Sequence, residues 1–162
     1  MNYSILLAQA ALNGLVIGAM YTLMAVGFTL TFGIMRVVNF AHGELYALGG
    51  YVAYAAVSVF DLNYFGSLIL AAIAGLVMGA LIEYVLLRRR DLGSIDEVML
   101  IMIGTMLIMQ NTELLAWGGV AKAVPSPFSQ EPLVWGEVSV SPIRLFVLCT
   151  ALVLLGVFYL LI

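Results

Sequence analysis

The first 35 residues of the chain carry no charged side chain, and this long apolar stretch constrains the fold more than any other feature. A helix needs about 20 residues, at about 1.5 Å each, to cross a hydrocarbon layer about 30 Å thick. Further apolar runs of similar length follow. The sequence therefore predicts helical segments of this kind within residues 9–32, 38–59, 64–87, 98–117 and 143–162.

Composition excludes a water-soluble domain. Hydrophobic residues make up 64% of the chain and charged residues only 9%, whereas a soluble domain has about 25% charged residues. The net charge of -3 leaves no basic surface for nucleic acid, so we expect no such partner. The one cysteine, Cys149, has no second cysteine to pair with. We expect an all-α fold, a polytopic bundle of about five transmembrane helices in a single domain over residues 1–162.

The second segment differs from the others because polar residues and glycines interrupt its apolar run. His42 and Glu44 lie near its start, and it contains Gly43, Gly49 and Gly50. Glycine permits backbone conformations that break a helix. We therefore expect this segment to be broken or short, and the sequence leaves open whether it crosses the membrane.

Basic residues predict how the chain is oriented. Arg88, Arg89 and Arg90 follow the third segment directly, and loops rich in Lys and Arg stay on the cytoplasmic side. With five crossings the N-terminus lies outside; if the second segment does not cross, the N-terminus changes side and the three arginines remain cytoplasmic. Residues 118–142 hold all four prolines, which predicts an external loop, with a small hairpin near residues 133–140.

Two glycine pairs, Gly14 with Gly18 and Gly75 with Gly79, have the spacing that lets membrane helices approach closely. Packing inside the bundle is the favoured interpretation for both pairs, because glycine is common in membrane helices. Dimerisation through either face is the alternative.

Polar residues are the informative ones in such a chain, because a charge within the bilayer costs a few kcal/mol unless it has a partner, water or a function. Asn39, His42, Gly43 and Glu44 form one such group. They line a translocation path or position a broken helix, or they form a structural network at a helix end. The residues alone do not decide between these interpretations. We expect no catalytic site, metal site or cofactor, since the chain has one histidine and no recognisable catalytic arrangement.

A second polar group lies in the fourth segment, where Gln110 and Asn111 are adjacent. Neighbouring residues on a helix point about 100° apart, so at most one of these two amides faces a given cavity. Hydrogen bonding between helices is the favoured interpretation, and lining of a pore is the alternative. Tyr21 is deep enough in the first segment to be a further cavity residue.

Two stretches resemble the permease subunits of bacterial branched-chain amino acid ABC importers. The first is residues 14–33 continued by residues 38–51, in which the string Asn-Phe-Ala-His-Gly-Glu at 39–44 is the specific part. The second is residues 101–111 with Trp117, Gly118 and the Val-Pro-Ser-Pro sequence at 124–127. The matches cover most of residues 10–145. By this resemblance Asn39, His42, Gly43 and Glu44 shape a broken second helix beside the path, Gln110 and Asn111 match a polar pair of the fourth helix, and Tyr21 matches by context.

The resemblance implies a multi-pass subunit of the bacterial inner membrane that is not an enzyme. It would pair with a second homologous permease, two cytoplasmic ATP-binding subunits and a periplasmic protein that delivers leucine, isoleucine or valine. Members of the family continue beyond the position of Ile162, so we expect this chain to be the N-terminal part of a longer domain. An importer of urea or short amides and a truncated, non-transporting membrane protein remain alternatives. A secondary transporter or channel half is disfavoured, since the first two and last two segments show no internal symmetry.

Overall fold

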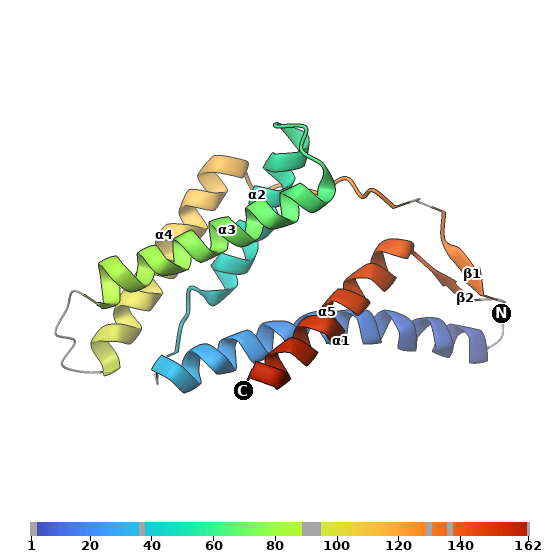
Figure 1. Ribbon diagram of the computed structural model, residues 1–162, viewed down its shortest axis with the longest axis horizontal. Coiled ribbons are helices and arrows are strands. Elements are labelled where there is room, and N and C mark those ends of the chain that lie inside the picture. The colour runs from blue at the N-terminus through green and yellow to red at the C-terminus, as the bar shows by residue number, and fades with distance from the viewer. Residues whose placement is uncertain (1–2, 36–37, 89–94, 129–130, 136–137, 162) are drawn as a thin grey trace. The chain divides into compact units, whose positions relative to one another are not determined.

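The computed structural model describes residues 3–35, 38–88, 95–128, 131–135 and 138–161. These residues form mainly α-helices, as the sequence predicts (Figure 1). The elements in chain order are α1 (Tyr3–Met35), α2 (His42–Ser58), α3 (Tyr64–Ile82), a π-helical turn η1 (Glu83–Leu87), α4 (Ile95–Trp117), β1 (Leu133–Trp135), β2 (Val138–Val140) and α5 (Pro142–Leu161).

Four of the described helical segments are long and apolar enough to cross a membrane: Ile5–Gly33, Tyr64–Leu87, Ile95–Trp117 and Pro142–Leu160. The prediction of a polytopic helical membrane protein is confirmed. The first helix begins at Tyr3, earlier than the expected 9–32 segment, and continues to Met35 because no proline or charge interrupts it.

The second segment is short and continuous. α2 has 17 residues, about 26 Å at 1.5 Å per residue, which is less than the hydrocarbon thickness. Its helix runs without a break through Gly43, Gly49 and Gly50. The irregular backbone precedes α2, where a turn at Phe40 and Ala41 redirects the chain.

The chain divides into two compact units, Met1–Leu30 with Ser126–Ile162, and Thr31–Pro125. In the first unit α5 crosses α1, and β1 and β2 form the predicted antiparallel hairpin, with Leu133 opposite Val140. Gln9 of α1 holds β2 through two hydrogen bonds. Its Nε2 donates to the Ser139 carbonyl at 2.8 Å, and its Oε1 accepts from the Ser139 amide at 3.1 Å.

In the second unit α2 and α3 pack as an antiparallel pair, and α4 lies against α2. The backbone amide of Gly66 donates to Asn63 Oδ1 at 2.6 Å, so Asn63 caps the start of α3. Ala41, Ile82, Val98, Met102 and Met109 form the buried hydrophobic cluster that joins these elements.

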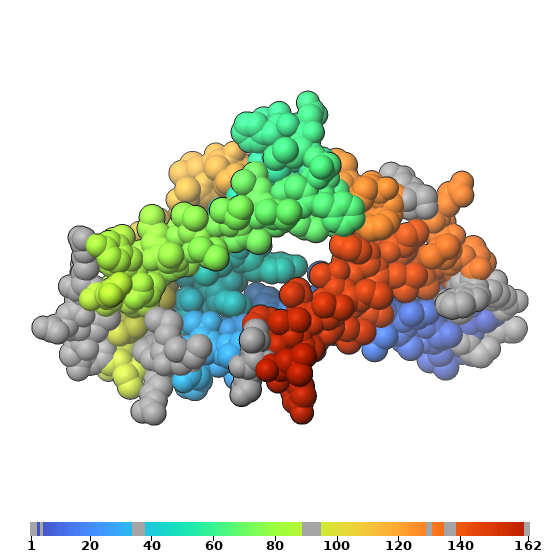
Figure 2. Space-filling model, viewed as in Figure 1, coloured from blue at the N-terminus to red at the C-terminus, as the bar shows by residue number. Residues whose placement is uncertain are grey.

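Most apolar side chains of the long helices are exposed. Only 11% of the most hydrophobic window of Tyr64–Leu87 is buried, and α3 contributes a broad strip of the surface seen in Figure 2. Leu76 of α3 is 73% exposed and Leu115 of α4 is 88% exposed. Exposure of so much apolar surface to water is unfavourable, so lipid or protein partners must cover these faces.

Candidate functional site

A buried carboxyl group marks the candidate site in the second unit. Glu113 is only 5% exposed, and no described residue forms a hydrogen bond with its Oε1 atom. Its position follows from the helical repeat, because the buried residues of α4 recur every three or four positions and form a single face. That face consists of Val98, Met102, Thr105, Met109 and Glu113.

The charged group that acts on Glu113 is another acid. Glu44, in the first turn of α2, is half-buried, and its charge repels that of Glu113. Two basic residues of the second unit are exposed. Arg88 is exposed at the end of η1, and Lys122 places its Nζ atom 5.6 Å from the centre of the Tyr54 ring.

Aromatic side chains lie one helical turn beyond Glu113, at the C-terminal end of α4. The rings of Trp117 and Tyr51 stack with centroids 5.0 Å apart and planes 18° apart. This pair connects α4 to α2, and Tyr54 with its Lys122 contact follows three residues along α2. The buried Glu113 thus lies on the same helix as an electron-rich ring of this aromatic pair, one turn before it.

The group at the start of α2 has a clear local structure. Asn39 Oδ1 accepts from the Ala41 amide at 3.0 Å, and the Asn39 carbonyl accepts from the His42 amide at 3.2 Å. These bonds form the turn that starts the helix, while Ala41 is fully buried. His42, Gly43 and Glu44 are all partly buried in the first turn of α2. A role of these residues in a translocation path stays a prediction.

The other predicted site residues lie elsewhere. Gln110 and Asn111 are exposed, and Asn111 Nδ2 donates to the Leu107 carbonyl of its own helix at 2.7 Å. Tyr21 is 69% exposed. Arg88 is exposed, whereas Arg89 and Arg90 lie outside the described residues. A Cβ atom added at Gly14, Gly18, Gly75 or Gly79 would meet nothing within 4 Å in the described part of the chain.

Sequence reasoning assigned no buried face to α4, and the roles predicted for Gln110 and Asn111 stay predictions. It favoured Gln110 and Asn111 as the polar residues of interest, whereas Glu113 is the polar residue that α4 buries at this end. The spacing of the residues could have indicated that Glu113 is buried, because Met102, Met109 and Glu113 share one helical face. Nearly every position of α4 before Gln110 is apolar, so this pattern has no polar opposite face to reveal it.

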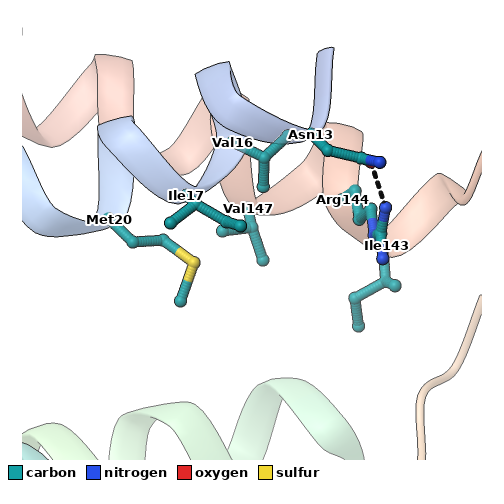
Figure 3. Close-up of a pocket in the computed structure, with 7 residues that line it drawn as sticks. All are labelled: Asn13, Val16, Ile17, Met20, Ile143, Arg144 and Val147. Carbon is teal, nitrogen blue, oxygen red and sulfur yellow. Dashed lines mark hydrogen bonds between the residues drawn. The ribbon is translucent and has the colours of Figure 1, made fainter. Parts of the chain in front are cut away.

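The first unit contains a separate cavity of about 330 Å³ between α1 and α5 (Figure 3). One end is polar, where Arg144 Nη1 donates to Asn13 Oδ1. Aliphatic and thioether side chains make up the rest, so the cavity is apolar apart from that pair. Its lining residues are Asn13, Val16, Ile17, Met20, Ile143, Arg144 and Val147.

Comparisons with known proteins match almost the entire chain. The family described as "Branched-chain amino acid transport system / permease component" matches residues 10–162. The chain is 33% identical over 141 residues to the high-affinity branched-chain amino acid transport system permease protein BraD of Pseudomonas aeruginosa, covering 82% of this chain and 46% of the relative. It is 31% identical over 134 residues to the permease protein LivH of Salmonella typhimurium and to LivH of Escherichia coli, covering 78% of this chain and 44% of each relative.

The matched stretches thus cover less than half the length of these relatives. No solved structure matches it significantly.

Proposed function

The chain belongs to the family of permease components of branched-chain amino acid transport systems, and on that premise we propose that it helps to carry leucine, isoleucine and valine across the bacterial inner membrane. The observation that carries this proposal is the family match over residues 10–162, together with relatives named as high-affinity branched-chain amino acid permeases. The matched family and relatives give no support to a urea or amide importer.

We propose that the subunit works in an ABC importer. Its partners are a second homologous permease, two cytoplasmic ATP-binding subunits that supply the driving force, and a periplasmic binding protein that delivers the amino acid. The exposed apolar faces of α1, α3 and α5 support assembly with other membrane helices and with lipid. The subunit itself is a transport component and not an enzyme.

We place the translocation path along the contact of α2 with α4. A zwitterionic amino acid needs polar partners inside the bilayer, and buried ionisable residues in membrane helices mark substrate pathways. Glu113 and Glu44 provide such groups, and Asn39 and His42 lie at the turn where α2 begins. Short helices that begin within a transporter commonly place their ends beside the substrate.

Uptake by the intact transporter tests this function. The full-length gene with its partner genes is expressed in a bacterial strain that lacks its own branched-chain amino acid importers, and uptake of radiolabelled L-leucine at low concentration is measured. We expect uptake that disappears when this gene alone is deleted. Unchanged leucine uptake after the deletion would contradict the proposal, and so would loss of urea uptake with leucine uptake intact.

A further inference from the structure

We propose that the cavity between α1 and α5 binds an anionic phospholipid, with the lipid phosphate at Arg144 and an acyl chain along the apolar wall of the cavity. This inference goes beyond the transport function and does not depend on it. The comparisons assign no ligand to these residues. Three observations carry the proposal: a cation at one end of an apolar cavity, the depth of that cation in the membrane, and the exposure of the apolar wall.

The first observation is the chemistry of the cavity. Arg144 is the one charged residue among the described residues that line it, and apart from Asn13 the others are aliphatic or thioether side chains. Arg144 Nη1 donates to Asn13 Oδ1, and this bond holds the guanidinium at the polar end of the cavity (Figure 3). A guanidinium has five N–H donors in a planar fork that suits phosphate oxygens. One bond to Asn13 leaves donors for such an anion.

The sign of the charge selects the class of ligand. The described lining contains no acid, so it complements an anion and offers no partner to the ammonium group of a zwitterionic amino acid. Two acids lie nearby in sequence. Glu131 is exposed, and Glu137 lies outside the described residues. A carboxylate at position 137 would compete for Arg144, so the binding experiment includes a substitution of Glu137.

The second observation is the depth of the cavity in the membrane. Arg144 lies in the first turn of α5, where a spanning helix meets the headgroup layer. From Asn13 the apolar segment of α1 continues to Gly33, about 20 residues or about 30 Å, which matches the hydrocarbon thickness. The polar end therefore lies at headgroup level on both helices, while Ile17 and Met20 lie within the hydrocarbon. A phospholipid has this same order of charge and chain.

The third observation is the exposure of the apolar wall. Ile17 is 54% exposed and Met20 is 42% exposed, whereas Val16 is only 6% exposed and closes the inner side. In the described part of the chain the cavity is therefore open along this wall. An acyl chain can enter it from the bilayer without leaving hydrocarbon. A helix of another subunit would exclude lipid if it covered the same wall, and the experiment distinguishes the two occupants.

Native mass spectrometry of the full-length permease assembly measures the site, because it resolves each bound lipid. The delipidated assembly in detergent is titrated with dioleoyl phosphatidylglycerol, which is anionic, and with dioleoyl phosphatidylcholine, which has the same chains and no net charge. We expect the first phosphatidylglycerol to bind about 10-fold or more tightly than the first phosphatidylcholine, the effect of a hydrogen bond between charged groups. Glycerol 3-phosphate, the headgroup phosphate without chains, should not compete.

Matched variants locate the site. Arg144→Gln removes the charge and keeps an N–H donor for Asn13, so it should lower the affinity for phosphatidylglycerol to that for phosphatidylcholine. A residue that only joins the helices would not produce this selective loss. Lys122→Gln removes a charge from an exposed position of the same loop and should leave the preference intact. Val147→Phe fills the apolar wall and should weaken binding of both lipids, whereas Val153→Phe, at a 65% exposed position of α5, should weaken neither.

The contrary outcomes are equally specific. Equal binding of the two lipids by the unmodified assembly would overturn the proposal, and so would a preference for phosphatidylglycerol that survives Arg144→Gln. If the preference appears only in Glu137→Gln, then Glu137 neutralises Arg144 and the lipid site is wrong. If Arg144→Gln does not assemble, Val147→Phe decides the question. Loss of phosphatidylglycerol binding supports the site, and unchanged binding overturns it, as expected if a partner helix covers the cavity.

Discussion

Asn63 and Asn39 each use a side-chain oxygen to accept a backbone hydrogen bond at the start of a helix. Asn63 has an extended backbone and caps α3 directly, with Gly66 as the donor. Asn39 accepts from Ala41 and turns the chain before α2. Asparagine suits both positions because its short amide competes with the backbone for hydrogen bonds. At both sites one side chain therefore determines where a helix begins.

The cap on α3 is open to a direct test. We expect Asn63→Ala to lower the free energy of unfolding of the assembly by about 1 kcal/mol, since an amide at the helix start loses its acceptor. Asn63→Asp keeps an acceptor and should be nearly neutral. Thermal unfolding of the full-length protein in detergent compares the variants. Equal midpoints for Asn63→Ala and the unmodified protein would show that the cap contributes nothing.

Gly66 offers a second variant at the same hydrogen bond. A Cβ atom at this position would lie 2.9 Å from Asn63 Oδ1, which is too close for the present geometry. Gly66→Ala should therefore destabilise the cap as well. In Asn63→Ala the obstructing oxygen is absent, so the two substitutions together should cost less than the sum of their separate effects.

At the level of elements, α2 and α3 approach closely because small residues face the contact. Ala53 and Ala56 of α2 are 5% and 1% exposed, and Ser67 of α3 is fully buried. In lipid, helices associate through close packing because apolar surface gains nothing by leaving hydrocarbon. Close packing of small side chains therefore stabilises this pair, as burial of large apolar residues stabilises a soluble core.

Enlarging one of these residues should disrupt the pair. Ala56→Leu adds carbon atoms at a position that is only 1% exposed, and we expect a loss of about 1–3 kcal/mol in the free energy of unfolding. Val59→Leu, at the 67% exposed end of the same helix, is the control and should be tolerated. Size-exclusion profiles and unfolding midpoints of the full-length protein measure both. A fully stable Ala56→Leu protein would mean that α2 and α3 do not pack through Ala56.

For the whole molecule, the orientation in the membrane depends on a few basic residues. Arg88 follows the π-helical turn at the end of α3 and is exposed, and Arg89 and Arg90 continue the run in sequence. Positive charge near the end of a spanning helix holds a loop in the cytoplasm. With so few charges elsewhere in the chain, these three arginines should dominate the side on which this loop lies.

Replacing all three arginines by asparagine should weaken control of topology. The readout is a Ser94→Cys reporter in a Cys149→Ser background, labelled in intact cells with a maleimide that does not cross the inner membrane. We expect labelling to rise in the asparagine variant and to stay absent when the arginines are replaced by lysine. Equal labelling in both variants would mean that other parts of the chain set the orientation.

The sequence by itself determined where the spanning helices lie. A helix in lipid must be apolar over about 20 residues, whatever its neighbours are. The segments predicted at 64–87, 98–117 and 143–162 therefore agree with the structure within a few residues, and the hairpin near 133–140 follows from local alternation and turn residues. The group at 39–44 could also be selected from sequence, because charged and polar residues in such a chain are rare.

Only the tertiary structure decided which face of each helix is buried. α4 buries Glu113 and leaves Gln110 and Asn111 exposed, although all three are polar and close in sequence. Tertiary contacts also bring Tyr51 onto Trp117, and they join Gln9 to Ser139 across 130 residues. The physical reason is that a membrane helix is apolar on every side, so its sequence carries little contrast between a face that meets lipid and a face that meets another helix.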